Sequence, residues 1–322
     1  MNISAPTIRI GTRSSKLALW QAEWVAGQLR AAGFESQLVL LRTLGDVTSG
    51  PIETVGGQGV FTKEIQRAVL DHQADVAVHS LKDLPTEAVS GLCLAAVPPR
   101  EANQDVLLAR AAASLDELPQ QARVGTGSAR RKAQLLAYRP DLHVADLRGN
   151  VETRLRKLDD GEYDAIVLAE AGLRRLGLAA RITQRLPPEM LLPAVGQGAL
   201  GLETRDGDQA TQQAVAALDD RITHQAVVAE RTLLAALRGG CLAPVGAWAR
   251  LANEPDRLAD ESLTAAGANR PAELRLDALV AKADGSRILR ATAVRPLSAA
   301  TELGSLVAGQ LIAQGADELL RR

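Results

Sequence analysis

Apolar and polar positions in the first hundred residues alternate between a strand pattern and a helix pattern. Short apolar runs are separated by stretches in which apolar residues recur every three or four positions, as Leu17, Trp20 and Trp24 do before Gly33 ends the stretch. We predict strands at 7–11, 38–43, 75–79 and 92–97, a helix between 17 and 29, and a helix capped by Thr62 that runs to about 71. Strands that alternate with helices in this way predict a parallel sheet covered by helices.

A second cycle of the same kind begins after the break at Pro98 and Pro99. We predict strands at 106–109, 123–125, 143–147 and 165–169, and helices at 128–138, 151–158 (capped by Asn150) and 171–176. Residues 196–218 have the pattern of an element that returns to the first domain. Two crossings, at about 100 and about 195, predict a hinge like that of bilobal ligand-binding folds.

The last hundred residues follow a different pattern. We predict a helix at 223–237, a hairpin of strands 274–282 and 287–294, and a final helix from about 298. Gly239 and Gly240 stop the first helix, Asp284 and Gly285 form the hairpin turn, and the Ala-, Asn-, Asp- and Pro-rich segment 251–272 is predicted to be a surface insertion. The expected fold class is α/β, with two βα domains, a hinge and a smaller α+β C-terminal domain. The predicted domain boundaries are 1–99 with 196–219, 100–195, and 220–322.

The composition of the chain disfavours some classes of protein function. The 322 residues include 37 basic and 38 acidic ones, so the formal net charge is −1 and any basic site must be local. Aromatic residues make up 2% of the chain, which disfavours base stacking and hence a nucleic-acid partner. The N-terminus lacks the pattern of a signal peptide, and no apolar run approaches the roughly 18 residues of a membrane span. We therefore expect a cytoplasmic protein without a membrane partner.

Charged residues gather at the ends of the predicted elements. Most follow a strand or open a helix: Arg13, Lys63, Lys82, Asp83, Arg130, Arg131, Arg148, Arg154, Arg174 and Arg175. In doubly wound sheets, ligands bind beyond the carboxyl ends of the strands, where helix N-termini attract anions. A single arginine at a helix end is usually a solvated surface charge. Recurrence at the same end of successive βα units instead favours a cleft for a ligand with several carboxylates or phosphates.

Two residues stand out as candidates for chemistry, each with a structural alternative. Asp83 is an acid among these cations, although an N-cap or a salt bridge to Lys82 is the commoner role for such a residue. Cys241 follows two glycines, which favours an exposed nucleophile, although a lone cysteine is more often buried and inert. The other cysteine, Cys93, is predicted to lie in the core, and His79 on a buried strand is predicted to be structural. The chain has no Cys/His cluster, so no metal site is expected.

Eight motifs together resemble one family in order and spacing. They are IGTRSSKLALWQ, GGQGVFTKEIQ, DVAVHSLKDLPT, VGTGSARRKAQL, LRGNVETRL, DAIVLAEAGLRRLG, LPAVGQGALG and GGCLAPVGA. The chain is similar to porphobilinogen deaminases over about residues 7–250. The resemblance implies three domains, the first two like periplasmic binding proteins, and a cytoplasmic monomer. It also implies hydroxymethylbilane synthase activity, in which four porphobilinogen molecules are joined head to tail with release of ammonia for tetrapyrrole biosynthesis.

The resemblance also implies roles for individual residues. Cys241 would carry a covalent dipyrromethane cofactor, and Asp83 would be the catalytic carboxylate. Matching cofactor-binding positions are Ser80, Lys82, Thr126, Ser128, Arg130, Arg131 and Arg148, and matching substrate-binding positions are Arg13, Ser15, Lys63, Arg154, Arg175 and Gln197. Each porphobilinogen bears two carboxylates, which the arginine fork pairs well. Gln58 stands where the family commonly has Lys, and Leu44 replaces a frequent polar or basic residue.

Two other classes compete with this assignment. A non-enzymatic bilobal anion-binding protein would explain the hinge and the arginines but would leave Cys241 without a role. A nucleic-acid binder would use the arginine-rich helices, but the neutral net charge and the few aromatic residues disfavour it.

Overall fold

The computed structural model describes residues 7–41, 62–240, 243–253 and 272–320. Contacts divide the chain into a first unit, Met1–Arg100 with Ala199–His224, and a second unit, Glu101–Gly198 with Gln225–Arg322. The division into three domains stays a prediction. None of the described helices is both long and apolar enough to span a bilayer.

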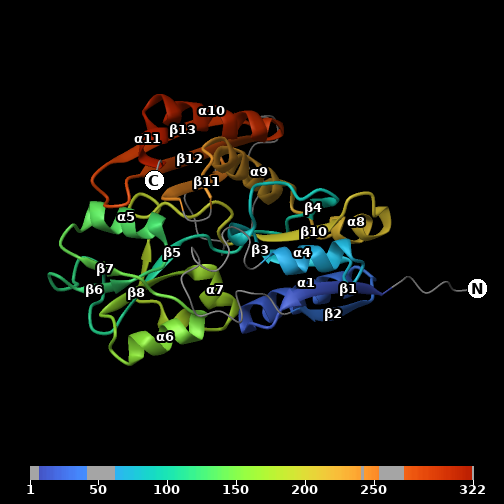
Figure 1. The fold of residues 1–322 in the computed structure, drawn as a ribbon, viewed down its shortest axis with the longest axis horizontal. Helices are drawn as coiled ribbons and strands as arrows, with labels where there is room; N and C mark the ends of the chain where they lie inside the picture. The colour runs from blue at the N-terminus through green and yellow to red at the C-terminus, as the bar shows by residue number, and fades with distance from the viewer. Residues whose placement is uncertain (1–6, 42–61, 241–242, 254–271, 321–322) are drawn as a thin grey trace, which may run out of the picture. The chain divides into compact units, whose positions relative to one another are not determined.

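The first unit is built on a five-stranded sheet of order β2-β1-β3-β10-β4 (Figure 1). Its strands are β1 (Ile8–Arg13), β2 (Ser36–Leu41), β3 (Val76–Ser80), β4 (Leu92–Ala96) and β10 (Leu200–Arg205). β1 runs parallel to β2 and β3, whereas β10 is antiparallel to β3 and β4, so the sheet that was predicted to be parallel is mixed. Two neighbouring parallel strands are usually joined by a crossover helix. β10 belongs to the segment that returns from the second unit and has no such connection to β3 or β4, so it need not be parallel to them.

Three helices of the first unit cover its sheet: α1 (Lys16–Ala31), α4 (Lys63–Leu70) and α8 (Gln209–Ala216). Because successive strand residues point to opposite faces, Val76 packs in a core with Leu29 of α1, whereas Ala77 packs in a second core with Ile65 of α4. Thr62 precedes α4 as predicted, but its side chain makes no capping hydrogen bond.

The second unit contains a five-stranded sheet of order β7-β6-β8-β5-β9. Its strands are β5 (Asp105–Ala109), β6 (Arg123–Gly125), β7 (His143–Ala145), β8 (Ala165–Ala169) and β9 (Gln184–Leu186). β6 is parallel to β7 and β8, and β5 is antiparallel to β8 and β9, so this sheet is mixed as well. Its helices are α5 (Ala129–Tyr138), α6 (Val151–Asp159) and α7 (Glu170–Arg175). Leu135 of α5 packs in the core on one face, and Leu155 and Leu173 of α6 and α7 pack in the core on the other.

A three-stranded antiparallel sheet completes the second unit. Its strands are β11 (Val245–Leu251), β12 (Glu273–Ala281) and β13 (Ile288–Pro296), and its helices are α10 (Ala300–Ala313) and α11 (Ala316–Leu320). Helix α9 (Arg221–Ala236) begins in the first unit, whose last residue is His224, and continues in the second. In Figure 1, α10 and α11 lie beside β12 and β13. The hairpin turn at Gly285 (φ +75°) is confirmed, while the predicted last helix is broken at Gly315 (φ +95°). Most of the predicted insertion 251–272 lies outside the described residues.

The architecture confirms the expected α/β class. Two helix-covered five-stranded sheets account for the two βα cycles, and the three-stranded sheet with its helices corresponds to the α+β part.

Candidate active site

In the first unit, five of the predicted site residues lie at one edge of the sheet. Arg13 ends β1 and Ser15 caps α1 by accepting a hydrogen bond from the Ala18 backbone N–H at 3.3 Å. Ser80 ends β3, and Lys82 and Asp83 lie in the 3-10 turn η1 (Leu81–Asp83) that follows. Because β1 and β3 are adjacent and parallel, their carboxyl ends bring these side chains to the same edge.

Ser80 is held by Gln21, which is not among the predicted site residues. The buried Gln21 of α1 donates through Nε2 to Ser80 Oγ at 2.8 Å, and Ser80 Oγ lies 3.3 Å from Gln21 Oε1. The turn after Ser80 is tied to β10, since the Leu81 N–H donates to the Ala199 carbonyl at 3.0 Å. The backbone and the hydroxyl at the end of β3 are therefore both fixed.

Asp83 is exposed at the end of this turn. In the part of the chain that the structure describes, its carboxylate takes part in no hydrogen bond or ion pair, and it caps no helix. Both structural alternatives for Asp83, an N-cap and a salt bridge to Lys82, are thus absent from the described residues. The carboxylate is available to a ligand.

In the second unit, three predicted site residues meet at one buried carboxylate. Asp105, at the start of β5, is fully buried and was not predicted as a site residue. Its Oδ2 accepts from Arg130 Nη1 at 2.7 Å, and its Oδ1 accepts from Arg131 Nε and Nη2 at 2.9 and 2.7 Å. Gln197 Nε2 also donates to Oδ1, at 2.9 Å, and to the Asn103 carbonyl at 2.7 Å. We call Asp105, Arg130, Arg131 and Gln197 the Asp105 cluster.

Charge pairing dominates the electrostatics of the Asp105 cluster. Burial by itself would raise the pKa of Asp105, but the charges and hydrogen bonds of Arg130 and Arg131 outweigh it and hold that pKa well below its ordinary value. Burial lowers the pKa of Arg130, against the opposing effect of Asp105. Both arginines are buried, and their two guanidiniums face one carboxylate, so the cluster keeps one net positive charge.

A second group of predicted residues surrounds the loop between β6 and α5. Ser128 caps α5 through the Arg131 N–H at 3.5 Å, and its own N–H donates to the buried Thr126 Oγ1 at 3.2 Å. The neighbouring loop carries Arg148, whose Nε donates to Asp146 Oδ2 at 2.9 Å. The two loops touch closely, because a Cβ at Gly127 would lie 2.9 Å from the Leu147 carbonyl and 3.4 Å from Arg148 Nε. Thr126, Ser128 and Arg148 are therefore brought together.

The remaining predicted residues lie apart from these groups or at their margins. Arg175 is buried and donates through Nη2 to the Gly198 carbonyl at 2.6 Å, next to Gln197. Burial lowers the pKa of Arg175 to about 10, against the opposing charge of Glu101. Arg154, in the first turn of α6, donates through Nε to the Gly149 carbonyl at 2.7 Å. Lys63 is exposed as the first residue of α4.

Gly198 is required next to Gln197 because its backbone has φ +86° and a Cβ there would lie only 2.4 Å from the Glu101 carbonyl oxygen. We expect Gly198→Ala to lower the free energy of unfolding by about 2 to 4 kcal/mol, since backbone strain and steric overlap add. The matched control is Gly207→Ala, which has φ +79° but no atom within 4 Å of the added Cβ, and which should cost only about 1 kcal/mol. Urea denaturation of both variants measures the difference, and equal losses would show that the overlap is relieved without cost.

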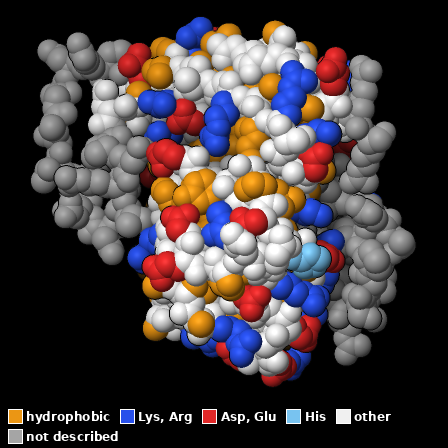
Figure 2. Space-filling view, turned by 90° about the vertical axis from the view of Figure 1, so that its left-hand side faces the viewer, with side chains coloured by type: hydrophobic (Ala, Val, Ile, Leu, Met, Phe, Trp, Pro, Cys, Tyr) orange, Lys and Arg blue, Asp and Glu red, His pale blue; other side chains and the backbone are white. Residues whose placement is uncertain are grey.

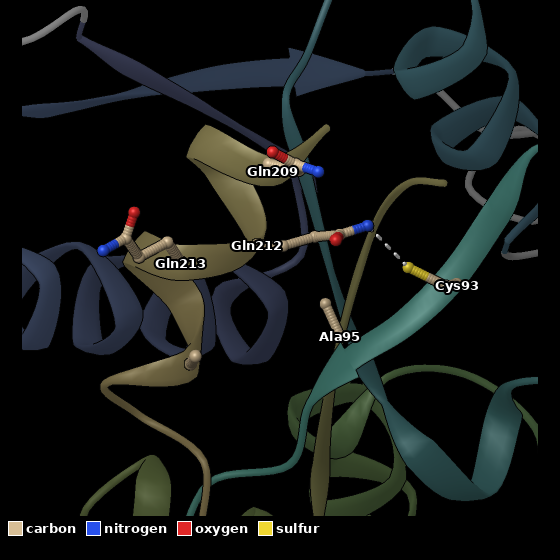
Figure 3. A pocket seen from close by; sticks show the side chains of 6 residues that line it. Cys93, Ala95, Gln209, Gln212 and Gln213 are labelled. Atoms are coloured by element: carbon tan, nitrogen blue, oxygen red, sulfur yellow. Dashed lines mark hydrogen bonds between the residues drawn. The ribbon is translucent and has the colours of Figure 1, made fainter. Parts of the chain in front are cut away.

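The two cysteines differ in what the structure describes. Cys241, with Leu44 and Gln58, lies outside the described residues. Cys93 on β4 is half-buried, so the prediction of a core position is wrong: β4 is an edge strand, and Cys93 faces a surface hollow that it lines with Ala95 and with glutamines of α8 (Figure 3). Its Sγ accepts from Gln212 Nε2 at 3.3 Å and lies 3.5 Å from Thr204 Oγ1.

His79 is buried on β3, and its structural role stays a prediction. Its buried Nε2 lies 2.9 Å from Glu203 Oε2, whose carboxylate also accepts from Gln66. No group of three metal-ligating side chains occurs among the described residues. Figure 2 shows that basic and acidic side chains are interspersed on the face it draws, without an extended patch of one sign.

Comparison with known proteins identifies the family. A model described as "Porphobilinogen deaminase, dipyromethane cofactor binding domain" matches residues 8–213, and one described as "Porphobilinogen deaminase, C-terminal domain" matches residues 224–313. Porphobilinogen deaminase of Syntrophotalea carbinolica is 46% identical over 321 residues, which cover 99% of this chain and 96% of that protein. That of Desulforudis audaxviator is 47% identical over 316 residues, covering 97% and 96%.

Among solved structures, a putative methionine-binding lipoprotein from Bacillus subtilis is similar with a TM-score of 0.42 and 12% identity, covering 67% of this chain and 92% of that one. The methionine-binding protein MetQ has a TM-score of 0.41 and 13% identity, covering 66% of this chain and 89% of that one.

Both family domains match in order, and the relatives align with almost the whole sequence. The chain therefore belongs to the porphobilinogen deaminase family.

Proposed function

We propose that this chain is a transferase that joins four porphobilinogen molecules head to tail, releases ammonia and forms hydroxymethylbilane for heme and porphyrin biosynthesis. The observation that carries the proposal is the Asp105 cluster, in which two buried guanidiniums face one carboxylate. A buried excess of positive charge is costly unless an anion is bound. Porphobilinogen carries an acetate and a propionate, so it and the pyrroles made from it supply such anions.

The residues present fit a dipyrromethane cofactor with carboxylate side chains. The buried Nε–H of Arg130 has no acceptor among the described residues, and the Asp105 cluster retains a net positive charge. Seven side chains are assigned to bind the carboxylates and ring N–H groups of the cofactor: Ser80, Lys82, Thr126, Ser128, Arg130, Arg131 and Arg148. When bound through a thioether to Cys241, the cofactor supplies the pyrrole end to which the first substrate is joined.

Asp83 is assigned the chemical role. Loss of the substrate's amino group as ammonia leaves a positively charged ring system, which a carboxylate stabilises more strongly than water does when it is held in place beforehand. The backbone of the turn that carries Asp83 is fixed by the Leu81–Ala199 hydrogen bond, and its exposed carboxylate would take its final position against the bound rings. It can accept hydrogen bonds from pyrrole N–H groups and assist proton movement to the leaving amine.

The substrate's acetate and propionate are assigned to a second set of polar side chains. This set is Arg13, Ser15, Lys63, Arg154, Arg175 and Gln197. Arg175 remains charged near neutral pH, because a pKa of about 10 lies well above that range. We further propose that the protein acts in the cytoplasm as a monomer, without nucleic-acid or membrane partners.

The proposed function is tested by mixing the purified full-length protein with porphobilinogen. We expect an intact mass that exceeds the chain mass by two pyrrole units, and consumption of four porphobilinogen molecules with four ammonia molecules released per product. A protein without the mass excess that binds porphobilinogen but does not convert it would instead be an anion-binding protein.

Replacing Arg148 by leucine is expected to leave mostly cofactor-free protein, because a cation beside Thr126 and Ser128 is lost. The pair that Arg148 forms with Asp146 is exposed, so stability should change little. Arg181→Leu is the matched control, since Arg181 forms an equally exposed pair with Asp159 in the same unit. Intact mass spectra measure the loaded fraction. Full loading of the Arg148 variant would remove Arg148 from the cofactor site.

Arg131→Leu is also expected to yield mostly cofactor-free protein, but it is a less selective test. Its removal leaves the buried Asp105 with fewer partners. Breaking a buried ion pair typically costs about 3 to 5 kcal/mol, so lost loading and lost stability would coincide.

A further inference from the structure

Asp105 is an acidic residue at the start of an apolar strand, and no sequence motif marks it as a functional residue. Its sequence context is DVLLA, and its side chain has no exposed surface. A buried carboxylate is tolerated only when hydrogen bonds and opposite charges compensate for the lost hydration. Four N–H donors from three residues that lie 25, 26 and 92 positions away supply this compensation. The carboxylate therefore joins segments that are distant along the chain.

The hydrogen bonds fix the orientation of both guanidiniums. Arg131 presents Nε and Nη2 side-on to Asp105, while its Nη1 donates to the Val167 carbonyl at 2.9 Å. Arg130 uses Nη1 for both Asp105 and the Leu192 carbonyl, the latter at 2.6 Å. An arginine has five N–H groups in a planar fork, so each side chain keeps N–H groups that these contacts do not use. One of them is the buried Nε–H of Arg130.

We propose that Asp105 is a positioning residue that orients Arg130, Arg131 and Gln197 for a ligand carboxylate and leaves one positive charge for that carboxylate to neutralise. The inference rests on the proposed function, in which these three side chains bind cofactor and substrate. Asp105 acts through its neighbours, since a side chain without exposed surface does not itself reach a ligand. A second buried acid in the cluster would cancel the net charge that attracts the ligand carboxylate. Without Asp105, the positive charges of Arg130 and Arg131 would repel each other.

The variant Asp105→Asn tests this role, with Asp75→Asn as a matched control. Asp75 in the first unit also binds two arginines, through Arg9 Nε and Nη2 and through Arg205 Nη2, but none of these is a site residue. Asp75 precedes β3, at the end opposite Ser80. Both variants remove one carboxylate shared by two arginines, so both should lower the thermal midpoint. We expect only the Asp105 variant to lose cofactor loading.

Loading is measured on the full-length chain, produced without cofactor, as the rate at which its intact mass gains two pyrrole units after porphobilinogen is added. We expect Asp105→Asn to load about 10- to 100-fold more slowly than Asp75→Asn at a temperature where both are folded, by analogy with the loss on removing the partner that orients a metal-binding side chain. Asp105→Glu keeps the charge but moves it by one methylene, and it should load at an intermediate rate.

Equal loading rates for Asp105→Asn and Asp75→Asn would overturn the proposal. If the asparagine variant does not fold, Asp105→Glu takes its place, and loading as fast as that of Asp75→Asn would overturn the proposal equally. Failure of the proposed function gives a different result: the wild-type chain itself would gain no pyrrole units. If the wild type and the Asp105 variants all load at the normal rate, the role of Asp105 is refuted and the proposed function is not.

Discussion

Replacing Cys241 by alanine is expected to give a folded protein that carries no cofactor and has no measurable turnover. In the proposed function the sulfur of Cys241 is the nucleophile that forms the thioether, and alanine has no group that can replace it. The purified variant should therefore have the mass of the chain itself, while the wild type exceeds its own chain mass by two pyrrole units. Circular dichroism spectra that match the wild type would show that the loss is chemical.

Cys93→Ala is the control for the Cys241 variant. Cys93 is half-buried, its Sγ accepts a hydrogen bond from Gln212, and it lies within hydrogen-bond distance of Thr204 Oγ1. Its removal should cost about 1 kcal/mol and leave loading and turnover intact. A Cys241 variant that still gains two pyrrole units would place the attachment elsewhere, and loss of that mass in the Cys93 variant would identify Cys93 as the attachment site.

The sequence pattern located the buried strands well but carried no information on strand direction. The predicted ranges 123–125 and 165–169 coincide with β6 and β8. β8, with the sequence AIVLA, is a short apolar run of the kind typical of buried strands. β9, with the sequence QRL, is too short and polar to be recognised. Strand direction depends on how the connections cross the sheet, so the antiparallel placement of β5 and β10 could not be read from hydrophobic periodicity.

The sequence shows which segments carry charged side chains, but it does not show which residues hold those side chains in place. Arg130 and Arg131 were found because two cations open a helix after a strand. Their partner Asp105 was missed because an acid at the start of a strand looks like an ordinary strand boundary. Gln21 was missed because an amide on the buried face of α1 gives no signal for a particular partner. Such pairings form between residues far apart in sequence, and only the tertiary structure specifies them.

Asp83→Asn is expected to keep the fold and the covalent cofactor but to lower the turnover rate on the order of a hundred- to a thousandfold, as does loss of a preorganised electrostatic group. The amide is nearly the same size as the carboxylate and can still accept a hydrogen bond. It has no negative charge, so it cannot offset the positive charge that develops as ammonia leaves. In the described part of the chain Asp83 makes no hydrogen bond or ion pair, so the thermal midpoint should not change.

Two further variants test whether the effect of Asp83→Asn comes from the charge of Asp83, from the position of that charge, or from loss of any exposed carboxylate. Asp83→Glu keeps the charge but shifts it by one methylene, so its turnover should fall less than that of Asp83→Asn. Asp71→Asn removes another exposed carboxylate of the first unit, which pairs only weakly with Arg67 at 3.4 Å, and it should leave turnover unchanged. Single-turnover measurements on loaded protein compare the three variants with the wild type.

The structural alternative for Asp83 leads to the opposite expectation. If Asp83 only capped a turn or paired with Lys82, asparagine would cap about as well, and turnover would barely change while stability fell slightly. The exposed position at the end of η1, behind a backbone fixed by the Leu81–Ala199 hydrogen bond, instead places a free carboxylate on a rigid support. A near-wild-type single-turnover rate for Asp83→Asn would remove Asp83 from the mechanism, and the charge that stabilises the reacting ring would then have to come from another carboxylate.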